Sequence, residues 1–306
     1  MTSRRATAVA AAAGLVADRV VGEPPDRWHP LRAFGSLMQA VEDAYWADSR
    51  AAGARHAAAG LAVGLAAGAG LRSTAAATEV AVGGRALWAA AAAVHAALDG
   101  GDVDRARALL PALAGRDPAG LDEKELARAV VESVAENTVD AIVAPALWGA
   151  VAGAPGALGY RAVNTLDAMV GHRSDRHLRY GWASARLDDA AGWVPARVTA
   201  ALVTAVRPRA APAVLAAVRA QAPGHPSPNA GVAEAAFAAA LGVRLGGLNV
   251  YGERMEERPA LGTGPPPVPA DIGRAVRLSS HAAWALAALL AGAGLSGRRR
   301  PARGRG

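Results

Sequence analysis

Apolar runs rich in alanine and glycine alternate with polar segments along this chain of 306 residues. The runs cover 6–22, 57–71, 73–98, 141–160, 192–222, 230–248 and 278–295. Small residues let helix backbones approach closely, which suits helices packed within a membrane. Only two Phe and four Tyr are present, fewer large side chains than a water-soluble core of this size would use. The pattern predicts an all-α, polytopic integral membrane helical bundle with polar cytoplasmic loops, in a single membrane-embedded domain over 1–306.

Two of these runs leave alternatives open. Gly60, Gly64 and Gly68 recur at every fourth position, which predicts a groove on one helix face for close packing; the alternative is plain low-complexity sequence. The run 6–22 is expected as a short membrane helix or as a hydrophobic helix docked on others. Because no run is a clean 20-residue span without charge, a soluble alanine-rich helical protein is the alternative to the membrane bundle.

One helix start is clearly marked. Asp122 and Glu125 resemble a capping box, in which each side chain accepts a hydrogen bond from the other's backbone N–H. The helix is expected to end near residue 143, because Pro145 follows and proline interrupts helices. Polar segments are expected to form the connections 23–56, 99–121 and 252–277.

Two near copies of one motif, 137–143 (NTVDAIV) and 164–170 (NTLDAMV), lie in strongly apolar surroundings. Charged residues surround both, although one charge at a bilayer centre costs at least ~3 kcal/mol. Such a cost indicates a functional site. The copies come either from an internal duplication that brings two Asn/Asp pairs together or from chance in a low-complexity chain.

Three carboxylates share one face of the helix that starts at Asp122. Glu132, Glu136 and Asp140 are four residues apart, so they stack along that face. Because like charges repel, a divalent ion or arginine side chains must stabilise them. Oxygen ligands of this kind suit Mg²⁺, which usually also bridges to substrate phosphates. The alternative is a solvated helix face with arginine partners.

Cationic groups and further acids follow the second copy of the motif. Arg161, His172, Arg173 and Arg176 are suited to an anionic substrate, because guanidinium groups bind phosphate and carboxylate bidentately. Asp188 and Asp189 form an acid pair; neighbours on a helix point about 100° apart, so only one can reach a shared ion. Taken singly, each residue is equally well explained by a structural ion pair.

Other functions lack their signatures in this sequence. The net charge of +7 comes from arginine, with Lys124 as the only lysine, and no nucleic-acid motif accompanies it, so no nucleic-acid partner is expected. The absence of cysteine excludes disulfides and thiolate metal sites. Lys124 follows no glycine-rich loop, which excludes a P-loop. Dispersed histidines speak against a zinc site.

Longer segments of the chain resemble a known family. They are 22–25 (GEPP), 29–30 (HP), 132–137 (ESVAEN), 164–173 (NTLDAMVGHR), 181–189 (GWASARLDD), 193–197 (WVPAR), 225–231 (HPSPNAG) and 242–247 (GVRLGG). In this order they are similar to the integral-membrane cobalamin-biosynthesis proteins of the CobD/CbiB type, the adenosylcobinamide-phosphate synthases. Glu23 departs from the family pattern, which has Gly-Asp-Pro at this loop; the change keeps a carboxylate but puts a metal-ligand role for Glu23 in doubt.

The resemblance implies an acid–amine ligase in the cell membrane, with several membrane passes. It would use ATP as cosubstrate and Mg²⁺ as cofactor to join (R)-1-aminopropan-2-ol, or its O-phosphate, to a propionate carboxylate of adenosylcobyric acid. Expected partners are this corrinoid, the amine, membrane lipid and other cobalamin-pathway membrane enzymes. A membrane transporter, an intramembrane Mg-dependent prenyltransferase and a non-catalytic scaffold are the alternatives, because intramembrane acids and paired Asn/Asp motifs also serve transport and diphosphate binding.

The resemblance and the residue chemistry together assign candidate site residues. The catalytic candidates are Glu132, Glu136, Asp188 and Asp189. The metal-ligand candidates are Glu136, Asn137, Asp140, Asn164 and Asp167. The substrate-binding candidates are Arg161, His172, Arg173, Arg176, His225 and Asn229, although the loop that holds His225 is also consistent with an ordinary turn. The arginine-rich segment 161–190 and the basic tail 298–306 are expected on the cytoplasmic side.

Overall fold

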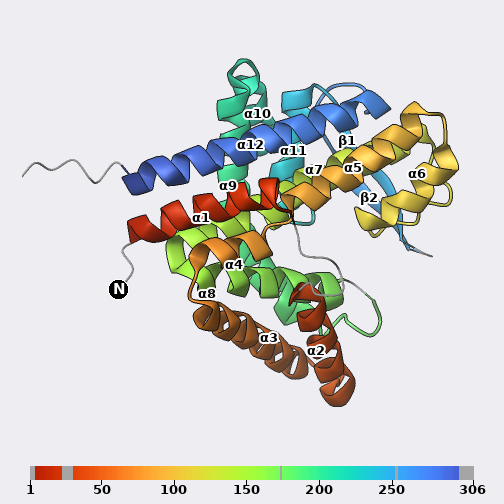
Figure 1. Cartoon of the computed structure of the whole chain (residues 1–306). Helices are drawn as coiled ribbons and strands as arrows, with labels where there is room; N and C mark the ends of the chain where they lie inside the picture. Colours follow the sequence, from red (N-terminus) through yellow and green to blue (C-terminus); the bar gives the residue numbers. More distant parts are fainter. Residues whose placement is uncertain (1–3, 23–29, 173, 252–253, 296–306) are drawn as a thin grey trace, which may run out of the picture. The chain divides into compact units, whose positions relative to one another are not determined.

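The computed structural model describes residues 4–22, 30–172, 174–251 and 254–295, and helices dominate it (Figure 1). The helices are α1 Arg4–Val20, α2 Pro30–Tyr45, α3 Arg50–Leu71, α4 Thr74–Ala81, α5 Gly84–Asp99, α6 Val103–Leu109, α7 Glu123–Thr138, α8 Ala144–Leu166, α9 Trp182–Val206, α10 Ala211–Ala220, α11 Ala230–Leu241 and α12 Pro269–Leu295. Short turns of helix are η2 Leu110–Ala112, η3 Val139–Val143, η4 Asp167–Gly171, η5 Pro208–Ala210 and η6 Ala222–Gly224. The strands are β1 Leu245–Tyr251 and β2 Arg254–Leu261.

The chain divides into two compact units. Unit 1 comprises Met1–Val82, Pro145–Ala185 and Ala285–Gly306, and unit 2 comprises Gly83–Ala144 and Arg186–Trp284. The single membrane-embedded domain expected over 1–306 stays a prediction. Glu23, Arg173 and the basic tail 298–306 lie outside the described residues.

Several helices are long and apolar enough to cross a membrane. Within the described ranges there are three such stretches, Thr74–Asp99, Glu123–Gly171 and Pro269–Leu295. A fourth is formed if Trp182–Val206 and Pro208–Gly224, which meet at 112°, are taken together. The predicted all-α membrane architecture is therefore confirmed. The cytoplasmic placement of 161–190 stays a prediction.

In unit 1, the glycines of α3 form the predicted groove, and α8 lies in it (Figure 1). A Cβ atom on Gly64 would lie 2.6 Å from the Cβ of Ala162, and one on Gly68 would lie 2.5 Å from the carbonyl oxygen of Ala154. Glycines nearer the end of α3 meet residues nearer the start of α8. The two helices are therefore antiparallel. Close packing is confirmed, since only glycine leaves room for the second backbone.

The segments 6–22 and 23–56 of unit 1 can be compared with the structure expected for them from the sequence. α1 packs against α4: a Cβ on Gly14 would lie 2.7 Å from the Cβ of Thr78. The run 6–22 is therefore a docked helix. The segment 23–56, expected as a loop, contains α2 and the start of α3, and this expectation was wrong. The apolar residues of α2 recur at helical spacing, but charged and polar residues lie between them.

The two copies of the repeated motif adopt the same local structure. In each copy an α-helix widens into one π-helical turn, η3 or η4, that contains the aspartate. Thr138 donates its hydroxyl to the carbonyl of Val134 at 2.6 Å, and Thr165 donates to that of Arg161 at 2.8 Å. One copy belongs to each unit. Because π-turns occur frequently at functional sites, both copies stay candidates, and the convergence of their Asn/Asp pairs stays a prediction.

The helix does not end near residue 143 as expected. It continues through Pro145 into α8, because the π-turn η3 reshapes the helix where proline removes a hydrogen bond. The carbonyl of Ala141, four residues before the proline, instead accepts a hydrogen bond from the N–H of Gly83 at 2.9 Å. The backbone breaks later, at Gly153, whose φ of 70° and ψ of −156° suit only glycine.

Unit 2 is built around α7, which contacts α5, α6, α11 and β1. Its start confirms the predicted capping box: Asp122 accepts from the N–H of Glu125 at 2.8 Å, and Glu125 accepts from that of Asp122 at 2.9 Å. Val130, Val131 and Val134 are fully buried. The segment 99–121, expected as a connection, also contains the short helices α6 and η2.

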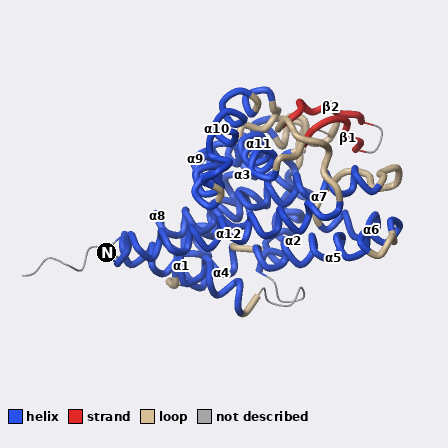
Figure 2. The backbone as a smooth tube through the Cα atoms, turned by 90° about the horizontal axis from the view of Figure 1, so that it is seen from above, coloured by secondary structure: helices blue, strands red, loops and turns tan. Residues whose placement is uncertain are grey.

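An antiparallel hairpin, β1–β2, follows α11 (red in Figure 2). The helix expected over 230–248 ends at Leu241, and the connection expected over 252–277 contains β2 and the start of α12; both expectations were wrong. The strands carry a β-bulge between Leu245 and Gly247. Gly246 has a φ of 87°, and a Cβ there would collide with the carbonyl of Pro259. A helix cannot continue through such a conformation.

Candidate active site

A buried cluster of acids and arginines surrounds a cavity of about 110 Å³ in unit 2. Its charged lining comes from segments far apart in the sequence: Arg116 before α7, Glu132 and Glu136 on α7, Glu234 on α11 and Arg258 on β2. The remaining lining residues are Leu113, Ala114, Gly115 and Ser133. Charge is thus concentrated in a small space that the fold encloses on several sides.

Glu132 is fully engaged by its neighbours. Its Oε2 accepts from Arg116 at 2.6 Å, and its Oε1 accepts from the N–H of Gly246 at 2.8 Å and from Arg128 at 3.3 Å. Asn249 accepts from both arginines at 2.9 Å. The β-bulge at Gly246 therefore turns a backbone N–H toward the carboxylate of Glu132. These contacts give Glu132 a role in holding the cavity walls together, and its catalytic role stays a prediction.

Glu136 and Glu234 differ from Glu132, because neither carboxylate has a hydrogen-bond partner within 3.5 Å among the described residues. A ring nitrogen of His225 lies 3.8 Å from the carboxylate of Glu234, and a guanidinium nitrogen of Arg258 lies 3.9 Å from it. Burial, followed by the charges of Glu132 and Glu136, raises the pKa of Glu234 well above its ordinary value. Its helix α11 is too short to be one of the membrane-crossing stretches.

His225 connects the loop 225–229 to this cluster. Arg258 lies 3.2 Å from its Nε2, and its Nδ1 lies 3.1 Å from the backbone nitrogen of Ser227 and 3.2 Å from the carbonyl oxygen of the same residue. Burial lowers the pKa of His225 below its ordinary value. The ring is therefore neutral, and the predicted substrate-binding residue lies beside the cavity.

Asn229 links the same loop to α9 rather than to the cavity. Its Nδ2 donates to the carbonyl of Asp189 at 2.9 Å, and its Oδ1 accepts from Arg197 at 3.3 Å. Asp189 also pairs with Arg186 at 3.8 Å. Asp188, which precedes it, is half-buried on α9. The described contacts give these residues a role in holding the loop, and their catalytic role stays a prediction.

The remaining candidates of α7 and η3 lie along one helix. Asn137 donates its Nδ2 to the carbonyl of Ser133 at 3.0 Å, which leaves its Oδ1 as an acceptor. Asp140 is half-buried on η3. Among the residues that the structure describes, no three His, Asp or Glu side chains gather closely enough to hold a metal ion. The predicted Mg²⁺ ligands thus form no ready-made site in the described parts of the chain.

Comparison with known proteins gives this cluster its context. The family model of the CobD/Cbib protein matches residues 11–279. The chain belongs to the CobD/CbiB family. It is 49% identical over 287 residues to the cobalamin biosynthesis protein CobD of Mycobacterium tuberculosis (strain ATCC 25618 / H37Rv), which covers 89% of this chain and 91% of that protein. The CobD of Chromobacterium violaceum is 45% identical over 292 residues, 90% and 93% of the two chains.

The family membership places the chain in cobalamin biosynthesis. No solved structure matches it. The family-like segments nevertheless acquire physical roles: 132–137 supplies two of the three acids that line the cavity among the described residues, 225–231 positions His225, and 242–247 carries the bulge at Gly246. The resemblance expected from the sequence is confirmed.

A second polar cluster lies in unit 1 and contains His172 and Arg176, two of the predicted substrate-binding residues. Glu42 accepts from Arg176 and pairs with His177, both at 2.9 Å. His172 contacts His177 at 3.2 Å between ring nitrogens. Arg161 donates to Asn164 at 3.3 Å. The carboxylate of Asp167 packs against Gly171.

Sequence reasoning missed several members of both clusters. They are Arg116, Arg128, Glu234, Asn249 and Arg258 in unit 2, and Glu42 and His177 in unit 1. A signal existed for Glu234, because it is the only acid in the apolar helix α11 and such an acid indicates function. Arg116 and Glu42 lie in segments that were expected to be loops, and no local pattern marks them.

We expect Glu42 to hold α2 in a pH-dependent way. Burial raises the pKa of Glu42, but hydrogen bonds and charges from His177 and Arg176 outweigh it, so the pKa lies below its ordinary value of 4.5. The stabilisation is therefore complete above about 4.5 and is lost as the pH falls through the lower pKa of the folded protein. Glu42→Gln should increase hydrogen exchange in α2 already at neutral pH. Asp43→Asn, an exposed neighbour, is the control; equal exchange in both variants contradicts the prediction.

Proposed function

We propose that this chain is an adenosylcobinamide-phosphate synthase of the cell membrane. It would join (R)-1-aminopropan-2-ol, or its O-phosphate, to a propionate carboxylate of adenosylcobyric acid and consume ATP. The proposal rests on one observation: in a chain of the CobD/CbiB family, the half-buried carboxylate of Glu136 and the buried carboxylate of Glu234 face a small cavity without hydrogen-bond partners among the described residues. Other cobalamin-pathway membrane enzymes are proposed as neighbours.

The chemistry requires activation of the corrinoid carboxylate. Transfer of the γ-phosphoryl group of ATP to a carboxylate oxygen gives an acyl phosphate and ADP. The amine nitrogen then attacks the carbonyl carbon, the C–N bond forms, and the C–O bond to phosphate breaks to release inorganic phosphate. The amine must lose a proton in this step, so a nearby carboxylate is needed as general base.

The cavity suits the amine. Its volume of about 110 Å³ corresponds to roughly three or four water molecules at ~30 Å³ each, which is room for a small amine but not for a corrin. In our proposal Glu136 attracts the ammonium group. Glu234, whose pKa is raised by burial, binds a proton more strongly than an ordinary carboxylate and takes the proton of the amine.

Cations around the cavity have a complementary role. Arg116 and Arg258 line it and would orient the phosphate of the amine or the carboxylate under attack. Magnesium would screen the phosphate charges of ATP during phosphoryl transfer. Since the described residues offer no ready group of three ligands, we propose that the ion enters with ATP. Asp140 and Asp167 remain candidates for contacting it.

The testing experiment measures product from cobyric acid, ATP, Mg²⁺ and each form of the amine with purified protein in detergent. We expect turnover by the unchanged protein, and a fall of at least about 100-fold in kcat for Glu136→Gln and for Glu234→Gln, the range typical of general acid–base residues. Glu123→Gln, the same change at an exposed position at the start of α7, should keep full activity.

Each other outcome is informative. Full activity of both cavity variants would refute the roles of Glu136 and Glu234. Absence of product from the unchanged protein would refute the ligase itself. Product in detergent, where vectorial transport is impossible, would exclude a pure transporter or scaffold.

A further inference from the structure

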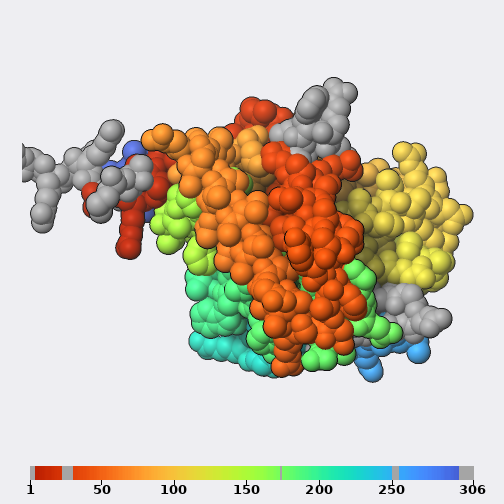
Figure 3. All heavy atoms as spheres, turned by 90° about the horizontal axis from the view of Figure 1, so that it is seen from below, coloured from red at the N-terminus to blue at the C-terminus, as the bar shows by residue number. Residues whose placement is uncertain are grey.

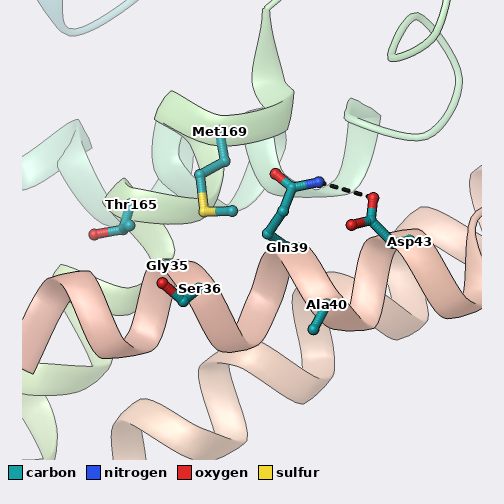
Figure 4. Close-up of a pocket in the computed structure, with 7 residues that line it drawn as sticks. All are labelled: Gly35, Ser36, Gln39, Ala40, Asp43, Thr165 and Met169. Carbon is teal, nitrogen blue, oxygen red and sulfur yellow. Dashed lines mark hydrogen bonds between the residues drawn. The ribbon is translucent and has the colours of Figure 1, made fainter.

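Unit 1 contains a larger and more open pocket than the cavity of unit 2. Its volume is about 560 Å³, and it lies between α2 and the second copy of the repeated motif (Figure 4). The lining residues are Gly35, Ser36, Gln39, Ala40 and Asp43 of α2, Thr165 of α8 and Met169 of η4. In Figure 4 the side chains of Gln39 and Met169 point toward each other across the gap.

The polar atoms of this pocket are mainly hydrogen-bond acceptors. Thr165 donates its hydroxyl proton to the carbonyl of Arg161. Its hydroxyl oxygen can therefore only accept a hydrogen bond from a ligand. Gln39 donates its amide to Asp43 at 3.1 Å, which leaves its Oε1 and the other oxygen of Asp43 as acceptors. Among the described residues that line the pocket there is no arginine, lysine or histidine. The pocket therefore suits a ligand that is rich in neutral N–H donors.

The helix α2 is a lightly held wall of this pocket. Only Met38 and Glu42 are buried among its residues. The ring of His56 contacts the carbonyl of Met38 at 3.1 Å, and Glu42 is held by Arg176 and His177. Figure 3 shows the face on which α2 and α3 (orange-red and orange) lie exposed. A wall with only two buried side chains can adjust to a ligand.

We propose that the pocket between α2 and η4 binds the carboxamide-bearing edge of the corrinoid substrate. The inference rests on the proposed function. A corrin edge carries primary carboxamides, each with two N–H donors, between methyl groups. The acceptor oxygens of Gln39, Asp43 and Thr165 match the carboxamide N–H groups, and the side chain of Met169 matches the methyl groups. A phosphate or carboxylate ligand is disfavoured by the charge of Asp43, which no cation of the described lining balances.

Glycine at position 35 allows a specific test. A Cβ on Gly35 has no atom within 4 Å, so Gly35→Phe places a ring in the pocket without disturbing the packing of unit 1. Gly70 on α3 is equally free of neighbours and lines no part of the pocket, which makes Gly70→Phe the matched control. Binding of cobyric acid is measured by quenching of tryptophan fluorescence in the detergent-solubilised protein, without ATP or amine.

We expect Gly35→Phe to weaken the binding of cobyric acid at least tenfold and Gly70→Phe to leave it unchanged. If Gly35→Phe does not fold, Ala40→Phe serves instead. Binding within twofold of the unchanged protein in a folded pocket variant overturns the inference, whether or not product forms. If the unchanged protein binds cobyric acid through this pocket but makes no amide, the proposed function fails and the pocket assignment stands.

Discussion

Replacing Glu132 by alanine is expected to destabilise unit 2 by about 3–5 kcal/mol, the usual cost of breaking a buried ion pair from one side. The variant removes the anion that Arg116 and Arg128 share, and the side chains of both arginines are only 7% and 11% exposed. Two buried guanidinium groups would then repel each other. Thermal unfolding followed by tryptophan fluorescence measures the effect, since the chain has seven Trp residues.

The control for this prediction is a surface ion pair of the same unit. Asp104 pairs with Arg107 at 2.8 Å, but its side chain is 91% exposed, so Asp104→Ala should change stability by less than about 1 kcal/mol. The comparison also separates two roles for Glu132. A variant that keeps its melting temperature but loses turnover would make Glu132 a catalytic group, as the sequence first suggested; a large loss of stability supports its role in holding the cavity.

Gly64→Leu is expected to separate α3 from α8 and to cost about 3 kcal/mol, the upper part of the range for overpacking. A Cβ there would lie 2.6 Å from that of Ala162 and 2.8 Å from the backbone oxygen of Leu158. The backbone of α8 cannot move aside as a flexible side chain would. The fraction of protein that elutes as a single species in detergent, together with its melting temperature, measures the loss.

Gly70→Leu is the matched control for the groove. It lies on the same helix and also replaces a glycine, but its added side chain meets no atom within 4 Å. It should be neutral or slightly stabilising, because leucine favours helix over glycine by somewhat less than 1 kcal/mol. Equal behaviour of the two variants would mean that the predicted glycine groove contributes nothing to the fold.

Local patterns in the sequence predicted the features that depend on residues close together in the chain. The spacing of Gly60, Gly64 and Gly68 predicted one close-packed face, and the pairing of Asp122 with Glu125 predicted one helix start; both are confirmed. The expectation of a helix end at Pro145 failed, because the hydrogen bond from Gly83 to Ala141 comes from a distant segment. No window around the proline contains that partner.

Some residues of the candidate site were predicted from the sequence, and others were found only in the structure. From the sequence came Glu132, Glu136 and His225, because acids in apolar surroundings and a family-like loop stand out along the chain. Their neighbours Arg116 and Arg258 did not stand out, since no local pattern marks the segments that hold them. The distinction between Glu132, which is saturated with hydrogen bonds, and Glu136, which has none among the described residues, also required coordinates.

The sequence by itself determined the helical membrane character, the family and the segments that carry charge into apolar surroundings, because hydrophobic period, capping and motif order are properties of neighbouring residues. Only the tertiary structure decided which charges meet. Arg116 reaches Glu132 across 16 positions, and Gly246 reaches it across 114. Electrostatic and hydrogen-bond energies depend on distances of a few ångströms in space, and separation along the chain does not fix those distances.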